Sequence, residues 1–171
     1  MAKFSVDDTI CAIATAPGEG AVGILRLSGP ESFAIGSRIF RSSSGCSWSS
    51  LRSRMLHHGR IIDARGKTVD EIMLAFFESP RSYTREDMVE IMAHGGPRVL
   101  REILQVLVQE GARIAEPGEF TKRAFLNGRI DLSQAEAVID LIRAKTERAK
   151  EQALEQLQGG FSRAVGAIKD K

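Results

Sequence analysis

The sequence has few cysteines, almost no net charge and no long hydrophobic run. Its two cysteines, Cys11 and Cys46, lack the spacing of a zinc site, so we expect two reduced thiols. The 24 Lys+Arg residues against 22 Asp+Glu residues argue against a histone-like or tail-type polyanion binder. No apolar stretch approaches the ~18 residues that span a bilayer, and Asp7 and Asp8 stand where a signal peptide would begin its apolar run. The sequence therefore predicts a cytoplasmic protein without a membrane span.

The first two thirds of the 171 residues alternate between strand-like and helix-like patterns. Five short runs have the length and composition of strands, namely 9–15, 21–28, 55–62, 72–78 and 86–93. Ser28 and Glu31 have the spacing of a capping box, which predicts a helix from there to about Phe40. A second helix is predicted to begin at Pro97 and to end at Gly111.

From Pro117 onward only helical patterns are present. A short helix is predicted to end at Asn127, and a second capping box at 133–136 predicts one long helix that continues to Gly159. The predicted fold class is therefore α/β (α+β). A mixed-sheet domain, 1–116, is followed by the beginning of an all-α helical domain, 117–171.

A basic segment, 38–67, holds seven Lys or Arg residues and a single acid, Asp63. Within it, 41–54 is rich in serine, a composition that predicts a solvated surface loop. Direct contact between these arginines and RNA phosphates is the alternative.

Two nucleotide-binding patterns can be set aside. Gly18, Gly20 and Gly23 satisfy G-x-G-x-x-G, but the pattern works only where it opens a helix, and a strand-like run follows here. The spacing of Gly18 and Gly23 also suits a P-loop, yet Ile24 and Leu25 replace the Lys and Ser/Thr that hold phosphate and magnesium. We expect neither a dinucleotide site nor a GTP site in this chain.

No arrangement of histidines or nucleophiles predicts a metal or catalytic centre. His57 and His58 are adjacent and would point to opposite faces of a strand, and His94 follows the end of another strand. The chain contains no nucleophile elbow or related catalytic signature. We therefore expect no metal site and no catalytic residue.

Three charged residues have more than one interpretation. Glu90 shares a predicted strand face with Met88 and Met92, and a carboxylate in such surroundings needs a partner. That partner is either an internal cation or the two parallel N–H donors of a flat heterocycle. Arg26, on its own predicted strand, likewise either pairs with an internal acid or binds a ligand. Arg129 follows a turn and has the spacing of a surface residue.

Several longer stretches carry a family resemblance. They are Asp8–Gly20, Gly23–Gly29, Ser82–Glu90, His94–Pro97, Pro117–Leu132 and Gln134–Val138. In their order and spacing they resemble the N-terminal part of the tRNA-modification GTPase family (MnmE, also called TrmE), and the resemblance covers nearly the whole chain. One departure is Arg85, which stands where the family usually has glycine.

The resemblance implies a folate-binding domain that also forms a homodimer, similar in fold to the folate-binding aminomethyltransferase of the glycine cleavage system. It implies a helical domain after this one, into which a Ras-like GTPase domain is inserted. The complete family enzyme acts with an FAD-dependent partner (MnmG, also called GidA) on C5 of the wobble uridine of tRNA. A tetrahydrofolate derivative, 5-formyl- or 5,10-methylene-tetrahydrofolate, supplies the one-carbon unit.

The family's folate contacts correspond to Arg26, Glu90 and Arg129 in this sequence. Glu90 would accept hydrogen bonds from the pterin amide N–H and the exocyclic amine. The arginines would hold polar or anionic parts of the folate. GTP, Mg²⁺ and K⁺ would bind only through a GTPase domain, whose motifs these 171 residues lack.

We therefore expect the folate-binding, dimerising N-terminal region of a larger tRNA-modification GTPase, which alone neither binds nor hydrolyses GTP. Two alternatives are a stand-alone folate-dependent aminomethyltransferase-like enzyme and an RNA-binding scaffold module that uses the 38–67 surface.

Overall fold

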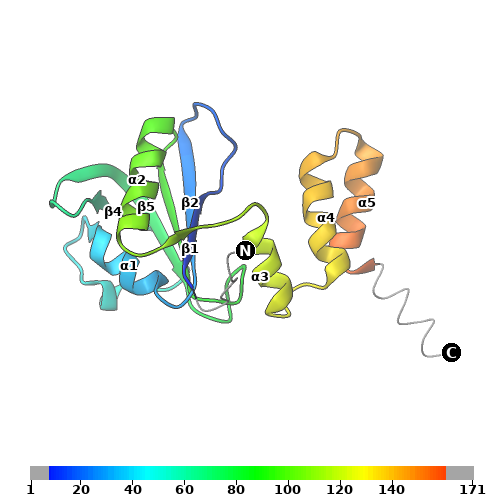
Figure 1. Ribbon diagram of the computed structural model, residues 1–171, viewed down its shortest axis with the longest axis horizontal. Coiled ribbons are helices and arrows are strands. Elements are labelled where there is room, and N and C mark those ends of the chain that lie inside the picture. The colour runs from blue at the N-terminus through cyan, green and yellow to red at the C-terminus, as the bar shows by residue number, and fades with distance from the viewer. Residues whose placement is uncertain (1–7, 161–171) are drawn as a thin grey trace. The chain divides into compact units, whose positions relative to one another are not determined.

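The chain forms two compact units, Met1–Pro117 and Gly118–Lys171. A computed structural model describes residues 8–160, and Figure 1 shows the helices and strands of each unit along the chain. The first unit contains a sheet with helices and the second contains helices, so the predicted α/β fold class is confirmed. None of the helices in 8–160 has the length and apolar character that crossing a bilayer requires.

The first unit is built on a seven-stranded sheet with the order β3-β4-β5-β6-β2-β1-β7. Its strands are β1 Ile10–Ile13, β2 Val22–Ser28, β3 Phe40–Ser42, β4 His57–Ile62, β5 Thr68–Phe77, β6 Met88–His94 and β7 Arg113–Ile114. Only β1 and β7 pair in parallel, so the sheet is mixed. All five predicted strands are present, and the two that the sequence did not predict, β3 and β7, are short edge strands.

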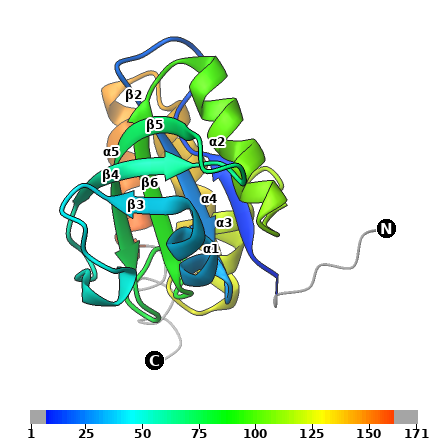
Figure 2. The ribbon, with the colours of Figure 1, turned by 90° about the vertical axis from the view of Figure 1, so that its left-hand side faces the viewer.

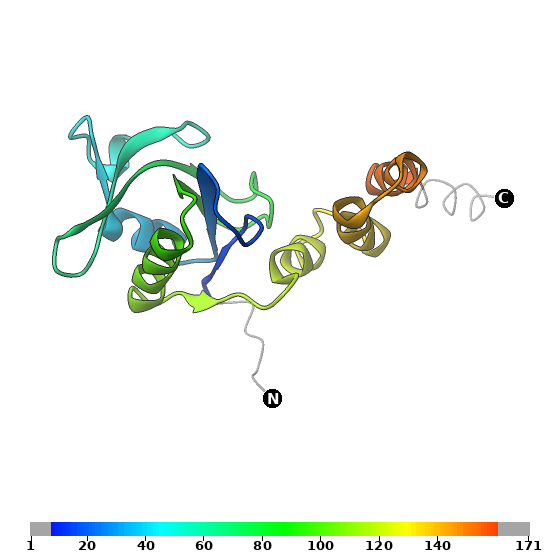
Figure 3. The ribbon, with the colours of Figure 1, turned by 90° about the horizontal axis from the view of Figure 1, so that it is seen from above.

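Two helices of the first unit, α1 Ser32–Ile39 and α2 Pro97–Gln109, pack on one face of this sheet. Figure 3 shows both on the same side of the curved sheet. The core between them and the strands includes Leu25, Leu27 and Val89. Because side chains alternate along a strand, the intervening residues project from the other side. We call that side the outer face; it carries Ile24, Arg26, Met73, Glu90 and Met92.

The capping box predicted at Ser28 is wrong. Ser28 is the last residue of β2, and its hydroxyl bonds to Thr84 and Glu86 on the loop before β6. The residue before α1 is Glu31, whose side chain makes no capping bond. Its backbone N–H donates instead to the Thr9 hydroxyl at 2.9 Å, a contact from a distant part of the chain.

The serine-rich segment is more ordered than its composition predicts. It contains the last two residues of strand β3 and a 3₁₀ helix, η1 Trp48–Ser50 (Figure 2 shows β3, β4 and β5 side by side). Trp48 packs against the core, with its ring centroid 5.3 Å from that of Phe76. A Cβ built on Gly36 of α1 would lie 2.7 Å from the Trp48 ring, so the helix leaves room for the indole. The prediction of a solvated loop is therefore wrong for Trp48, whose side chain packs against the core.

The second unit contains α3 Glu119–Leu126, α4 Leu132–Arg143 and α5 Glu147–Leu157. The predicted short helix that ends at Asn127 is confirmed, but the single long helix is two helices. Thr146 interrupts it and caps α5 by accepting from the backbone N–H of Ala149 at 3.2 Å. The capping box of α4 is also two residues earlier than predicted, since it joins Asp131 and Gln134.

Both cysteines are free, and their surroundings differ. Cys11 is completely buried in β1, and burial raises the pKa of its thiol to about 11, although Arg113 acts in the opposite direction. At pH 8 such a thiol is ionised in only about one molecule in a thousand, and the thiolate is the nucleophile.

We expect a thiol reagent to modify one cysteine per folded chain at pH 8, the exposed Cys46. Cys46→Ser should remove this rapid reaction and leave Cys11 reactive only after denaturation. Rapid labelling of the folded Cys46→Ser variant would contradict this prediction.

Candidate functional site

Arg26 and Glu90 form an ion pair on the outer face of the sheet. They lie directly opposite each other in the register of β2 and β6, and Arg26 Nε donates to Glu90 Oε1 at 2.7 Å. The side chains are 33% and 14% exposed, respectively. The internal ion pair, one of the two interpretations of Glu90, is therefore present, with both partners still partly open to solvent.

The pair keeps unused hydrogen-bonding capacity. Within residues 8–160, the described bonds of these side chains use only Arg26 Nε and Glu90 Oε1. Glu90 Oε2 and the two terminal amino groups of Arg26 make no hydrogen bond among these residues and can therefore bond to a ligand. An ionised carboxylate offers about four lone-pair positions, so even Oε1 can accept a second bond. The site thus presents both acceptors and donors at one position on the sheet.

The loop between β5 and β6, residues 78–87, covers one end of the outer face beside this pair. Arg26 Cζ lies 5.3 Å from the centre of the Tyr83 ring, within cation–π distance. The loop is fixed to the end of β2 because Thr84 is fully buried and the Ser28 hydroxyl bonds to Thr84 Oγ1 at 2.6 Å and Glu86 Oε2 at 2.8 Å. These contacts hold Tyr83 against Arg26.

Arg85 lies on the same loop. Its φ of +60° falls in the left-handed region that favours glycine, the residue that the family usually has here. The departure from the family pattern therefore leaves the turn in a glycine-like conformation and places strain on Arg85.

A groove of about 400 Å³ lies on the outer face at the other side of the ion pair. It is lined by Ala21, Val22, His58, Glu71, Ile72, Met73, Met92, Ala93 and His94. Its floor is mostly apolar, and both histidines on its rim are held by acids. His58 Nε2 lies 2.7 Å from Glu71 Oε1, and His94 Nδ1 lies 2.7 Å from Asp70 Oδ1.

Arg129, the third residue of the predicted folate set, belongs to the second unit. It lies in the turn between α3 and α4, where its backbone N–H donates to the Ala124 carbonyl at 2.8 Å, and it is exposed. The structure therefore brings Arg26 and Glu90 together within the first unit, and Arg129 is placed only within the second.

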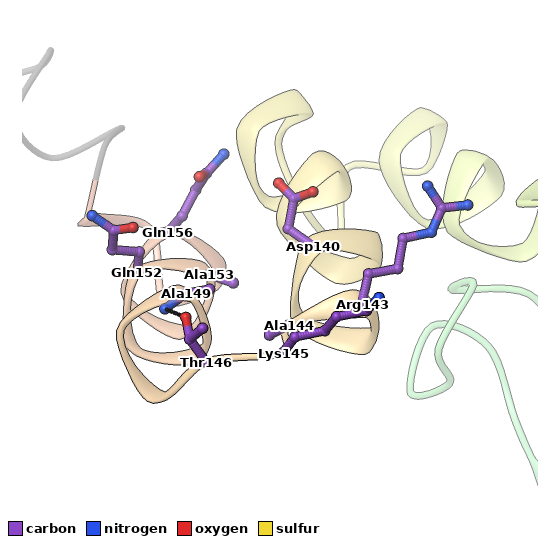
Figure 4. Close-up of a pocket in the computed structure, with 9 residues that line it drawn as sticks. All are labelled: Asp140, Arg143, Ala144, Lys145, Thr146, Ala149, Gln152, Ala153 and Gln156. Atoms are coloured by element: carbon purple, nitrogen blue, oxygen red, sulfur yellow. Dashed lines mark hydrogen bonds between the residues drawn. The ribbon is translucent and has the colours of Figure 1, made fainter.

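Another hollow, of about 530 Å³, lies at the α4–α5 hairpin. Figure 4 shows the side chains that line it, among them Asp140, Arg143 and Gln152. None of the three predicted folate residues lines it. In the part of the chain that the structure describes, no three His, Cys, Asp or Glu side chains gather as metal ligands.

Sequence reasoning singled out Arg26 and Glu90 and placed Met92 on the same strand face as Glu90, but it missed Tyr83 and Met73. Alternation along single strands places a residue on a face, yet it does not give the register that sets Met73 opposite Met92. Tyr83 lies in the family-like stretch Ser82–Glu90, and only the fold of that loop shows which cation its ring contacts.

Comparison with known proteins agrees with this architecture. Residues 9–129 match the family model described as GTP-binding protein TrmE N-terminus, and residues 132–171 match that of the MnmE helical domain. The boundary between the two models thus lies just before α4, whereas the compact units divide after Pro117.

Curated relatives carry the same family name. The tRNA modification GTPase MnmE of Bacillus subtilis (strain 168) is 52% identical over 165 residues, which are 96% of this chain and 36% of the relative. The proteins of the same name from Streptococcus pneumoniae (strain Hungary19A-6) and Streptococcus sanguinis (strain SK36) are 54% and 55% identical, over 96% and 92% of this chain. They are covered over 35% and 34% of their own lengths, so the chain spans about a third of these relatives. With both models matched in order, the chain belongs to the MnmE (TrmE) family of tRNA-modification GTPases.

Proposed function

We propose that this chain is a folate-binding and dimerising region of a tRNA-modification GTPase. The observation that carries the proposal is the Arg26–Glu90 pair, in which one carboxylate oxygen and the terminal N–H groups of the guanidinium make no hydrogen bond to any residue of 8–160. Glu90 accepts the pterin amide N–H and exocyclic amine, while Arg26 and Arg129 hold polar or anionic parts of the folate. All three residues lie within the region that matches the family model, which extends from residue 9 through Arg129.

The chemistry of the pair suits this ligand. A reduced pterin has a flat edge with two parallel N–H donors, and a carboxylate has two oxygens with matching spacing. Arg26 orients the carboxylate by holding Oε1, and the main-chain ladder between β2 and β6 fixes both Cα positions. A site on central strands is rigid, which limits the ordering that a ligand must impose when it binds.

We further propose the role of this region in the complete protein, following the names of its relatives. The bound folate, 5-formyl- or 5,10-methylene-tetrahydrofolate, supplies a one-carbon unit for C5 of the wobble uridine of tRNA. An FAD-dependent partner (MnmG, also called GidA) acts in the same reaction. GTP, with Mg²⁺ and K⁺, binds to the GTPase domain of the complete protein, and the sheet unit forms the homodimer contact.

Calorimetric titration of the wild-type chain with 5-formyltetrahydrofolate tests the proposal. We expect saturable binding with one folate per chain, and sedimentation of the same samples should show a dimer. GTP titrated under the same conditions should give no binding heat, because the chain lacks a P-loop. Absence of folate binding by the folded wild-type chain would refute the folate role, and a monomer at all concentrations would refute the dimer contact.

A further inference from the structure

The outer face around the ion pair is closed at one end and open at the other. Toward Ser28 and Met88 it is covered by the 78–87 loop, and these two side chains are 0% and 3% exposed. In the opposite direction along β6, Glu90 is followed by Met92 and then His94, which line the 400 Å³ groove. A ligand held by Glu90 can therefore extend along the strands in one direction only.

The distances along the strand match the parts of a folate. With a rise of about 3.3 Å per residue, Met92 lies ~7 Å beyond Glu90, roughly one bicyclic ring away. In a folate, the aromatic aminobenzoyl arm leaves the pterin from the ring opposite the edge that donates hydrogen bonds. A pterin edge held at Glu90 and directed away from the covered end thus places this arm over Met92 and its cross-strand neighbour Met73.

The groove has the lining that an aromatic ring requires. Met73 and Met92 form its floor between β5 and β6, and Val22, 60% exposed, forms part of its wall. Methionine side chains adapt to the shape of a ring and make favourable sulfur–aromatic contacts. Covering the exposed side chain of Val22 with an aromatic ring is favourable, because it removes apolar surface from water.

We propose that this groove is the subsite for the aminobenzoyl arm of the folate. The proposal rests on the folate site at Arg26 and Glu90. It adds that Met73 and Met92 distinguish a folate from a simple pterin, so the groove is a specificity element of the site.

The rim of the groove sets a limit on this recognition. Asp70 and Glu71 carry negative charge there, and their carboxylates already bond to His94 and His58. The rim therefore offers no unbalanced positive charge to the glutamate tail of a folate. The groove is thus expected to recognise the aminobenzoyl ring and to contribute nothing to the recognition of the glutamate tail.

Two ligands and two variants test the subsite. The wild-type chain is titrated with 5-formyltetrahydrofolate and with 6-methyltetrahydropterin, which lacks the arm. The same titrations are made with the variants Met73→Ala and Met92→Ala. Met55→Ala is the matched control, because Met55 is an exposed methionine that does not line the groove.

In the wild type we expect the folate to bind at least about tenfold more tightly than the pterin, as expected for burial of one ring. Each groove variant should lose most of this difference and keep its affinity for the pterin, which also shows that the variant is folded. The control should match the wild type. Equal binding of both ligands by the wild type, or an unchanged folate affinity in both groove variants, would overturn the subsite while leaving the folate site standing. Failure of the folded wild type to bind either ligand would overturn the folate site itself.

Discussion

Replacement of Glu90 by glutamine is expected to weaken the binding of 5-formyltetrahydrofolate by about 100-fold or more. A hydrogen bond to a charged group contributes ~1.5–3 kcal/mol, and each ~1.4 kcal/mol changes an affinity tenfold. Glutamine keeps the shape of the side chain but loses the charge. It also turns one of the two oxygens into an NH₂ donor, which would face a donor of the pterin. Calorimetric titration measures the loss directly.

The matched control is Glu110→Gln. Glu110 also pairs with an arginine, since Arg38 Nε lies 2.6 Å from its Oε2, but this pair lies at the end of α2 rather than on the outer face. The Glu110→Gln substitution should leave the folate affinity unchanged. A similar loss in both variants would show that a general change of charge weakens binding. An unaltered affinity of Glu90→Gln, with wild-type protein that does bind, would remove Glu90 from the site.

The Arg26–Glu90 pair also shows how far the sequence alone leads. Strand alternation placed each residue on a face and showed that Glu90 needs a partner, but it offered two kinds of partner. The choice depends on register, which sets Arg26 opposite Glu90 rather than two residues away. Register follows from packing across the whole sheet, where residues distant in sequence meet, so a single strand does not contain it.

The errors in the helices have a similar origin. The apolar spacing of the last predicted helix continues through 144–146 without glycine or proline, so periodicity alone predicts one helix. The break depends on the Thr146 cap and on bonds between the two arms, such as Gln134 Nε2 to the Leu157 carbonyl at 2.8 Å. Ser28 likewise lies in a sequence that is typical of a helix cap, but its hydroxyl bonds to Thr84 and Glu86, which are distant in sequence.

Gly29, directly after Ser28, is a position where we expect a large loss of stability from adding a single methyl group, because an unusual backbone conformation and a close approach of other backbone atoms coincide there. Its φ is +129°, and a Cβ there would lie 2.6 Å from the Asp8 carbonyl oxygen and 2.7 Å from Thr9 Cα. Both obstacles are backbone atoms, which do not swing aside as a flexible side chain does. The Gly29 N–H also donates to the Asp87 carbonyl at 3.0 Å, which holds the backbone in place.

We expect Gly29→Ala to lower the free energy of unfolding by about 3 kcal/mol or more. This estimate joins ~1–3 kcal/mol for an unfavourable backbone conformation with ~1–3 kcal/mol for a steric overlap in a packed region. Urea denaturation followed by fluorescence measures it, because Trp48, the single tryptophan, reports on the core of the first unit. The midpoint should fall, while the slope of the transition stays unchanged.

Two control variants separate strain from overlap. Gly66 has a φ of +77°, and a Cβ there would have no atom within 4 Å, so Gly66→Ala adds conformational strain alone and should cost about 1 kcal/mol. Gly20 has an ordinary φ, and a Cβ there would meet only the Val22 carbonyl at 3.7 Å, so Gly20→Ala should change stability by less than ~0.5 kcal/mol. The expected order of destabilisation is therefore Gly29, Gly66, Gly20. If Gly66→Ala and Gly29→Ala cost the same, the close approach of residues 8 and 9 to Gly29 contributes nothing, and the backbone conformation alone explains why glycine is needed there.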